Sequence, residues 1–128
     1  MDNQPEALNS DLLDREQIQM LLEAGASESA ELFEELLSMY EGESQAKLNE
    51  LQKLLEDGNL RDMGRAAHAL AGSSANVGAK QVWATAKEIE NASKSDDKSG
   101  IPELFKRLLD QYQVTLVDLR CVLEALKS

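Results

Sequence analysis

The chain has 128 residues and a mass of 14.1 kDa, a length that suits one compact domain. Hydrophobic residues make up 42% and charged residues 29%, so the chain can bury a core and is not expected to be disordered. The formal net charge of −11 argues against nucleic acid as a partner, because phosphate backbones repel such a field. A single cysteine, Cys121, and a single histidine, His68, exclude an internal disulfide and a cluster of histidine metal ligands.

The sequence predicts a cytoplasmic protein without membrane insertion. No stretch approaches the ~20 apolar residues of a membrane span. Residues 1–5 lack the charged and then apolar start of a signal peptide. We expect residues 1–12 to form a flexible N-terminal arm and residues 13–127 to form one domain.

A short first helix is predicted to begin after Asp14, whose side chain suits the N-cap position. Gln17 stands three residues later, where a capping-box partner belongs, and Leu13 and Ile18 have the spacing of a hydrophobic staple. The helix is expected to stop at Gly25.

A second helix is predicted from a cap at Ser27 towards Glu56, with leucines mostly three or four residues apart. Gly42 interrupts this pattern, which indicates either a bend or a weak turn. The break that follows contains Gly58, a residue suited to the left-handed position at a helix end.

Two shorter helices are predicted next, at residues 60–76 and at about residues 79–93, separated by Gly78. The first carries a narrow stripe of apolar or small residues, and the second would pack through three apolar positions. These core residues are Met63, Ala67, Leu70, Ser74 and Val77, then Val82, Ala86 and Ile89.

The last helix is predicted to open at Pro102 and has the most regular pattern. Its seam residues are spaced alternately four and three apart: Ile101, Phe105, Leu108, Tyr112, Thr115, Leu119, Val122 and Leu126. Four main helices joined by short loops predict an all-α fold, an antiparallel four-helix bundle with a short extra N-terminal helix.

A bundle explains the leucines but not the surroundings of His68. Gly64 and Gly72 lie one helical turn before and after it on the same face, and each costs roughly 1 kcal/mol against alanine in a helix. Ala71 and Ala75 keep the neighbouring ridge low. This pattern predicts an exposed imidazole that another protein can approach closely.

The charges near this histidine also differ from those of the rest of the chain. Residues 64–87 contain no acid, and their only charged side chains are Arg65, Lys80 and Lys87. An exposed histidine, neutral at physiological pH and set among cations, is a candidate nucleophile.

The segment His68-Ala69-Leu70-Ala71-Gly72-Ser73-Ser74, followed by Gly78, resembles the signature of histidine-containing phosphotransfer domains, H-x-L-K-G-S-S-x-x-x-G. The order of predicted helices is also similar, over residues 14–126. The resemblance implies that His68 accepts the phosphoryl group and that Gly72 lets a partner approach. It further implies that Glu90, on the next helix, orients the ring.

Ala71 departs from this signature, which usually has lysine three residues after the histidine. A lysine there would favour the charged phosphoryl group electrostatically. Arg65, Lys80 and Lys87 are the candidates to supply that charge instead. Together with Gly64, Ala71, Gly72, Ala75 and Glu90, they form the predicted binding site around His68.

The resemblance implies a phosphoryl carrier rather than an enzyme, monomeric and without a cofactor of its own. Its partners would be response-regulator receiver domains, which bring magnesium, and a hybrid sensor histidine kinase. One alternative is a binding module that docks a receiver or kinase without carrying phosphate, a possibility that Ala71 keeps open. Another is an assembly bundle that oligomerises through the seam of the last helix.

Overall fold

The structure, a computed structural model, describes residues 10–128, and these contain helices and no strand. The helices are α1 (Arg15–Gly25), α2 (Ser29–Asp57), α3 (Leu60–Asn76), α4 (Lys80–Lys94) and α5 (Ile101–Lys127), with a short 3-10 helix, η2 (Ala26–Glu28), before α2. The predicted all-α class and bundle architecture are confirmed. None of these helices has the length and apolarity that a membrane crossing requires.

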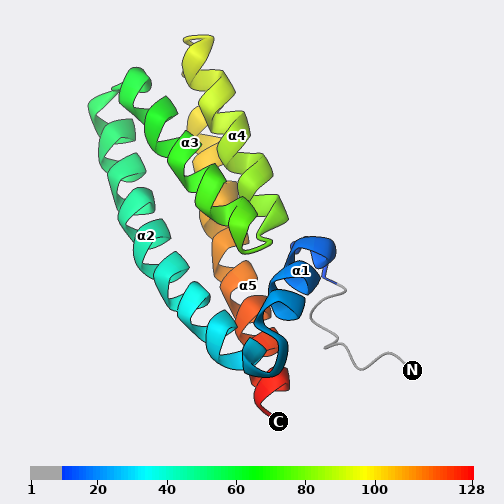
Figure 1. The fold of residues 1–128 in the computed structure, drawn as a ribbon. Coiled ribbons are helices and arrows are strands. Elements are labelled where there is room, and N and C mark those ends of the chain that lie inside the picture. Colours follow the sequence, from blue (N-terminus) through cyan, green and yellow to red (C-terminus); the bar gives the residue numbers. More distant parts are fainter. Residues whose placement is uncertain (1–9) are drawn as a thin grey trace.

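The long helices α2 and α5 run the length of the molecule, and the shorter α3 and α4 complete the bundle over one half of it (Figure 1). α3 packs against α2 and α4, and α4 packs against α5. α1 lies at the other end, where it packs on α2. The apolar stripes predicted for α3, α4 and α5 face inward, and of the α5 seam only Leu126 is not fully buried. That seam is used inside the chain, so it is not the free oligomerisation surface that the assembly alternative needs.

The start of α1 confirms the predicted N-cap but not the reciprocal bond. The Asp14 carboxylate accepts from the backbone N–H of Gln17 at 3.2 Å. The Gln17 amide does not return to Asp14, because it donates to the carbonyl of Asn76 at 3.0 Å. The backbone N–H of Asp14 donates instead to the carbonyl of Gly78 at 2.7 Å. Tertiary partners thus replace the capping box predicted from local spacing.

The prediction that Ser27 caps the second helix, α2, is wrong. Ser27 lies inside η2, and α2 begins two residues later with no side-chain cap. α2 continues without interruption through Gly42, which is exposed. Gly58 ends it in the left-handed conformation, with φ +71°, as predicted.

Gly78 lies in the turn between α3 and α4. Its φ of +79° is unfavourable for any residue with a Cβ, and a Cβ there would lie 2.7 Å from Cγ1 of Ile18. Glycine therefore lets α1 close over the turn. The predicted bounds of α3 are confirmed, and those of α4 differ by one residue at each end.

Residues 1–9 of the predicted arm lie outside the described residues, and residues 10–12 are held to the bundle. The Ser10 hydroxyl donates to Asp118 on α5 at 2.6 Å, and Gln81 on α4 donates its backbone N–H to the Leu12 carbonyl at 3.3 Å. Residues 10–12 therefore contact the bundle, while the predicted arm and domain bounds stay a prediction.

Buried hydroxyl groups form hydrogen bonds that join α2 to α3 and α2 to α5. Tyr40 pairs with Ser74 at 2.8 Å, and Ser44 pairs with Tyr112 at 2.6 Å. The two tyrosine rings lie 6.1 Å apart between centroids. Thr115 is the exception, because its buried hydroxyl has no hydrogen-bond partner within residues 10–128.

Candidate functional site

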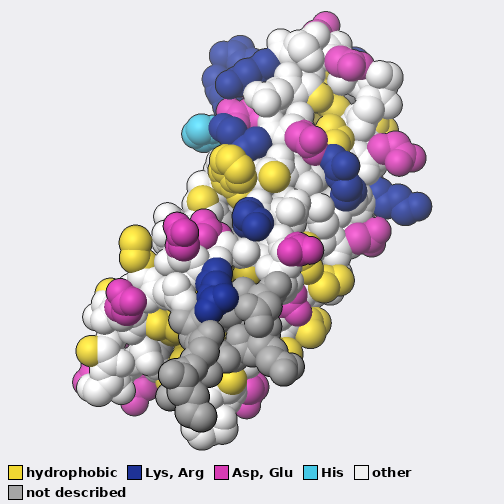
Figure 2. Space-filling view, turned by 90° about the vertical axis from the view of Figure 1, so that its right-hand side faces the viewer, with side chains coloured by type: hydrophobic (Ala, Val, Ile, Leu, Met, Phe, Trp, Pro, Cys, Tyr) yellow, Lys and Arg dark blue, Asp and Glu magenta, His cyan; other side chains and the backbone are white. Residues whose placement is uncertain are grey.

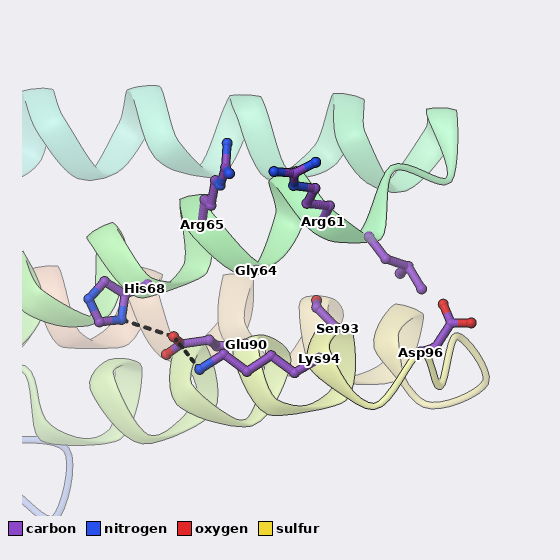
Figure 3. A pocket seen from close by; sticks show the side chains of 9 residues that line it. Arg61, Gly64, Arg65, His68, Glu90, Ser93, Lys94 and Asp96 are labelled. Carbon is purple, nitrogen blue, oxygen red and sulfur yellow. Dashed lines mark hydrogen bonds and ion pairs between the residues drawn. The ribbon is translucent and has the colours of Figure 1, made fainter.

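His68 lies near the middle of α3 with 69% of its side chain exposed. Its Nδ1 is 2.9 Å from Oε2 of Glu90 on α4. The other ring nitrogen, Nε2, points away from Glu90, along α3 in the direction of its C-terminal half (Figure 3). The ring is therefore held by one nitrogen and presents the other to solvent, as the prediction of an accessible histidine requires.

Glu90 has a buried side chain, 6% exposed, and its charge is shared by several cations. Lys87 donates to Oε1 at 2.8 Å, and Lys94 lies 3.3 Å from Oε2. The hydrogen bond from Lys87 is the largest of the effects that lower the pKa of this carboxyl to about 2, against the opposing effect of burial. Because an ionised carboxylate only accepts, Nδ1 of His68 carries a hydrogen, and in the neutral imidazole Nε2 then holds the lone pair.

The two glycines flanking His68 have different surroundings. A Cβ on Gly72 would meet no atom of a neighbouring element within 4 Å, so packing inside the chain does not require a glycine there. A Cβ on Gly64 would lie 3.4 Å from Cβ of Ser93 on α4. Gly72 therefore faces open space, and its role in the approach of a partner stays a prediction, whereas Gly64 lies on the side of α3 that faces α4.

The predicted basic residues do not all gather around the imidazole. Lys87 bonds Glu90, and the Arg65 guanidinium points away from His68 and lies 3.9 Å from Asp62 (Figure 3). Lys80 is the first residue of α4, seven positions before Lys87, and within the described residues no hydrogen bond or ion pair joins its side chain to the site. The structure thus brings Lys87 to the histidine through Glu90 and leaves Lys80 apart.

Ala71, which was predicted to keep the ridge beside His68 low, is buried. Only 2% of this residue is exposed, because it belongs to the face of α3 that packs in the core. A lysine introduced there would have to leave the core before its charge reached solvent. Ala75, in contrast, is exposed.

Two cations of the site were missed from the sequence. Lys94 lies four residues after Glu90 on α4, and Arg61 lies four before Arg65 on α3, a spacing that places each pair on one helix face. The signal was present, but the acid-free window of 64–87 excluded both residues. Figure 2 shows Lys and Arg side chains gathered beside the only histidine of the chain.

Chemically, this arrangement suits a nucleophile, because one ring nitrogen is held by Glu90 and the imidazole is largely exposed. Within residues 10–128, no three side chains of His, Cys, Asp or Glu are grouped so that they could hold a metal ion.

Comparisons with known proteins identify the family and the fold. The family model described as the Hpt domain matches residues 35–118. No curated protein matches significantly. Solved structures of similar fold include the following two. Histidine-containing phosphotransfer protein B (HptB) from Pseudomonas aeruginosa PAO1 has a TM-score of 0.78 and 22% identity, over 87% of this chain and 93% of its own. The phosphotransfer protein MtHPt2 from Medicago truncatula has a TM-score of 0.79 and 24% identity, over 91% and 80%.

Proposed function

Because the chain belongs to the Hpt domain family of histidine-containing phosphotransfer proteins, we propose that His68 carries a phosphoryl group on Nε2 and exchanges it with receiver-domain aspartates in a two-component phosphorelay. The single observation that supports this most strongly is the ring geometry. Nδ1 is bound to buried Glu90 at 2.9 Å, while the imidazole is largely exposed.

The transfer step needs no proton to move at the attacking atom. The Nε2 lone pair attacks the phosphorus of the partner's aspartyl phosphate, an N–P bond forms, and the P–O bond to the aspartate breaks. The aspartate leaves as a carboxylate. His68 keeps the hydrogen on Nδ1 and gains a positive charge, which faces the Glu90 carboxylate. The reverse sequence passes the phosphoryl group to another receiver.

The chain supplies a positioned nucleophile and an open approach, and the receiver supplies the remaining groups. Gly72 leaves room for the incoming aspartate, since nothing of the protein lies where its side chain would be. Magnesium belongs to the receiver in this proposal. The protein is therefore a carrier rather than an enzyme with a complete active site of its own, and we expect it to act as a cytoplasmic monomer between a hybrid sensor kinase and its response regulators.

The test is phosphotransfer profiling of the whole chain against the receiver domains of its organism, each phosphorylated in turn. We expect radiolabel to move to this chain as acid-labile, base-stable phosphate and to be absent from His68→Gln. Nitrogen NMR of the phosphorylated ring should place the phosphorus on Nε2. Label that persists in His68→Gln, or label on Nδ1, would refute the assignment.

A second candidate is a binding module that docks a receiver or kinase without carrying phosphate. The observation that favours it is Ala71, which stands where the family signature has lysine and is buried. The same profiling distinguishes the two functions: a module binds a receiver with measurable affinity, yet takes up no label from any of them.

A further inference from the structure

A hollow of about 670 Å³ lies between the N-terminal half of α3 and the C-terminal half of α4, on the Nδ1 side of His68 (Figure 3). Leu60 and the bare backbone of Gly64 line it from α3, and Ser93 lines it from α4. It is open to solvent, and its size lies within the range of ligand-binding clefts. Its surface is thus partly apolar and unfilled by the protein itself.

The edge of this hollow is rich in cations. Arg61 and Arg65 come from α3, and Lys94 comes from α4. Arg61 has no ion-pair partner within residues 10–128, and the only one of Arg65 is Asp62, at 3.9 Å. In a chain with a net charge of −11, three cations around one hollow form a local positive region.

Two carboxylates also line the hollow, but neither forms an ion pair with Arg61 or Arg65. Glu90 is already bonded to Lys87 and His68 and lies 3.3 Å from Lys94. Asp96 lies at the outer end, in the loop after α4 (Figure 3). The unpaired positive charge therefore lies along the α3 edge.

The hollow and the reactive nitrogen lie on opposite sides of the imidazole. Nε2 points along α3 away from Gly64, whereas the hollow begins at the Nδ1 side and extends towards Leu60 (Figure 3). A group seated in the hollow would leave Nε2 accessible. One protein could therefore fill the hollow and place an aspartate at Nε2 at the same time.

We propose that this hollow is a second docking point for the receiver-bearing partner, and that it takes an apolar side chain flanked by carboxylates from that protein. The apolar side chain would cover Leu60 and Gly64, and the carboxylates would face Arg61 and Arg65. This inference rests on the proposed function, because it assigns the partner's contact beside the transferring histidine. Its consequence is partner choice, since a receiver without such an acidic segment would lose these contacts.

Charge reversal with a matched control tests the proposal. Arg61→Glu changes the net charge by the same amount as Lys53→Glu, which replaces an exposed lysine on α2 with no ion-pair partner among the described residues. Arg61 lies in the first turn of α3, where a glutamate is favoured by the helix dipole, so the fold should tolerate the change. The probe is the receiver domain that exchanges phosphate fastest in the profiling, and its Kd is measured by titration calorimetry.

We expect Arg61→Glu to weaken receiver binding about tenfold at low salt and less at high salt, and Lys53→Glu to change it less than twofold. Amide shifts on binding, followed by NMR, should include Gly64, Ser93 and Lys94. Equal effects of the two reversals, or no shift at these amides, would overturn the inference while phosphotransfer to His68 remained intact. Failure of the proposed function is a different result, namely that no receiver labels His68.

Discussion

Replacing Glu90 with glutamine removes the charge that holds His68 and leaves a side chain of nearly the same shape. The carboxylate bonds Nδ1 of His68 and the ammonium group of Lys87, and it lies 3.3 Å from that of Lys94. Glutamine keeps one acceptor oxygen but adds an amide that donates, so one of these partners loses its acceptor. We expect lower stability and slower phosphotransfer, because the neutral amide no longer selects the hydrogen on Nδ1.

The size of the stability effect follows from the pKa of Glu90. Folding lowers it from an ordinary 4.5 to about 2, and each pKa unit is worth about 1.4 kcal/mol, which gives about 3 kcal/mol at neutral pH. Glutamine retains part of the hydrogen bonding, so we expect Glu90→Gln to cost about 2 kcal/mol. For a domain of this size that corresponds to a fall in Tm of roughly 6–10 °C.

The pH dependence gives the sharper test. A carboxyl whose pKa is lowered in the folded state stabilises that state above its unfolded pKa, and this contribution is lost as the pH falls through the folded pKa. The difference in unfolding free energy between wild type and Glu90→Gln should thus be constant above about pH 5 and shrink between pH 4.5 and pH 2. Urea unfolding followed by circular dichroism measures it, with Glu56→Gln, an exposed position on α2, as the control. A difference that is absent at pH 7, or unchanged at pH 2.5, would refute the reasoning.

Three further substitutions test separate parts of the structure. Gly72→Gln should raise the unfolding free energy by up to about 1 kcal/mol, because glycine is the poorer helix former, yet slow transfer sharply by filling the approach to His68; an unchanged transfer rate would contradict the clearance argument. Tyr40→Phe should cost about 1–2 kcal/mol in chemical denaturation, since it leaves the buried Ser74 hydroxyl without its partner, and a neutral effect would argue against that bond. Thr115→Val should leave stability unchanged or raise it by about 1 kcal/mol, because the hydroxyl it removes is buried and unpaired; a clear loss would indicate a partner for it.

Local patterns predicted most of the helices because each stripe had one dominant period. The ends of α3 were predicted from Gly58 and Gly78, whose positive φ angles are needed by the local turns alone. Ser27 failed as a cap because the chain first makes a 3-10 turn there, which a cap pattern does not reveal. The capping-box prediction for Gln17 was wrong because its side chain donates to the carbonyl of Asn76, a residue 59 positions away.

For the candidate site as well, local patterns identified some residues, and others depended on how the helices pack. His68 and Gly72 could be found from spacing on one helix, and Glu90 from the family resemblance. The burial of Ala71 could not, because it depends on how far α3 is rotated against its neighbours. The hollow beside Gly64 needed two helices to be placed side by side, and sequence periodicity fixes each helix only by itself.

The anchoring of residues 10–14 has a consequence for the order in which the chain can fold during synthesis. Asp14 is bonded to Gly78 after α3, Leu12 to Gln81 at the start of α4, and Ser10 to Asp118 late in α5. Translation delivers these partners long after the segment itself has left the ribosome, and domains fold as units on that timescale. The segment therefore stays without these partners while the intervening helices are synthesised. Its bond from Ser10 to Asp118 can form only when more than a hundred further residues have been added.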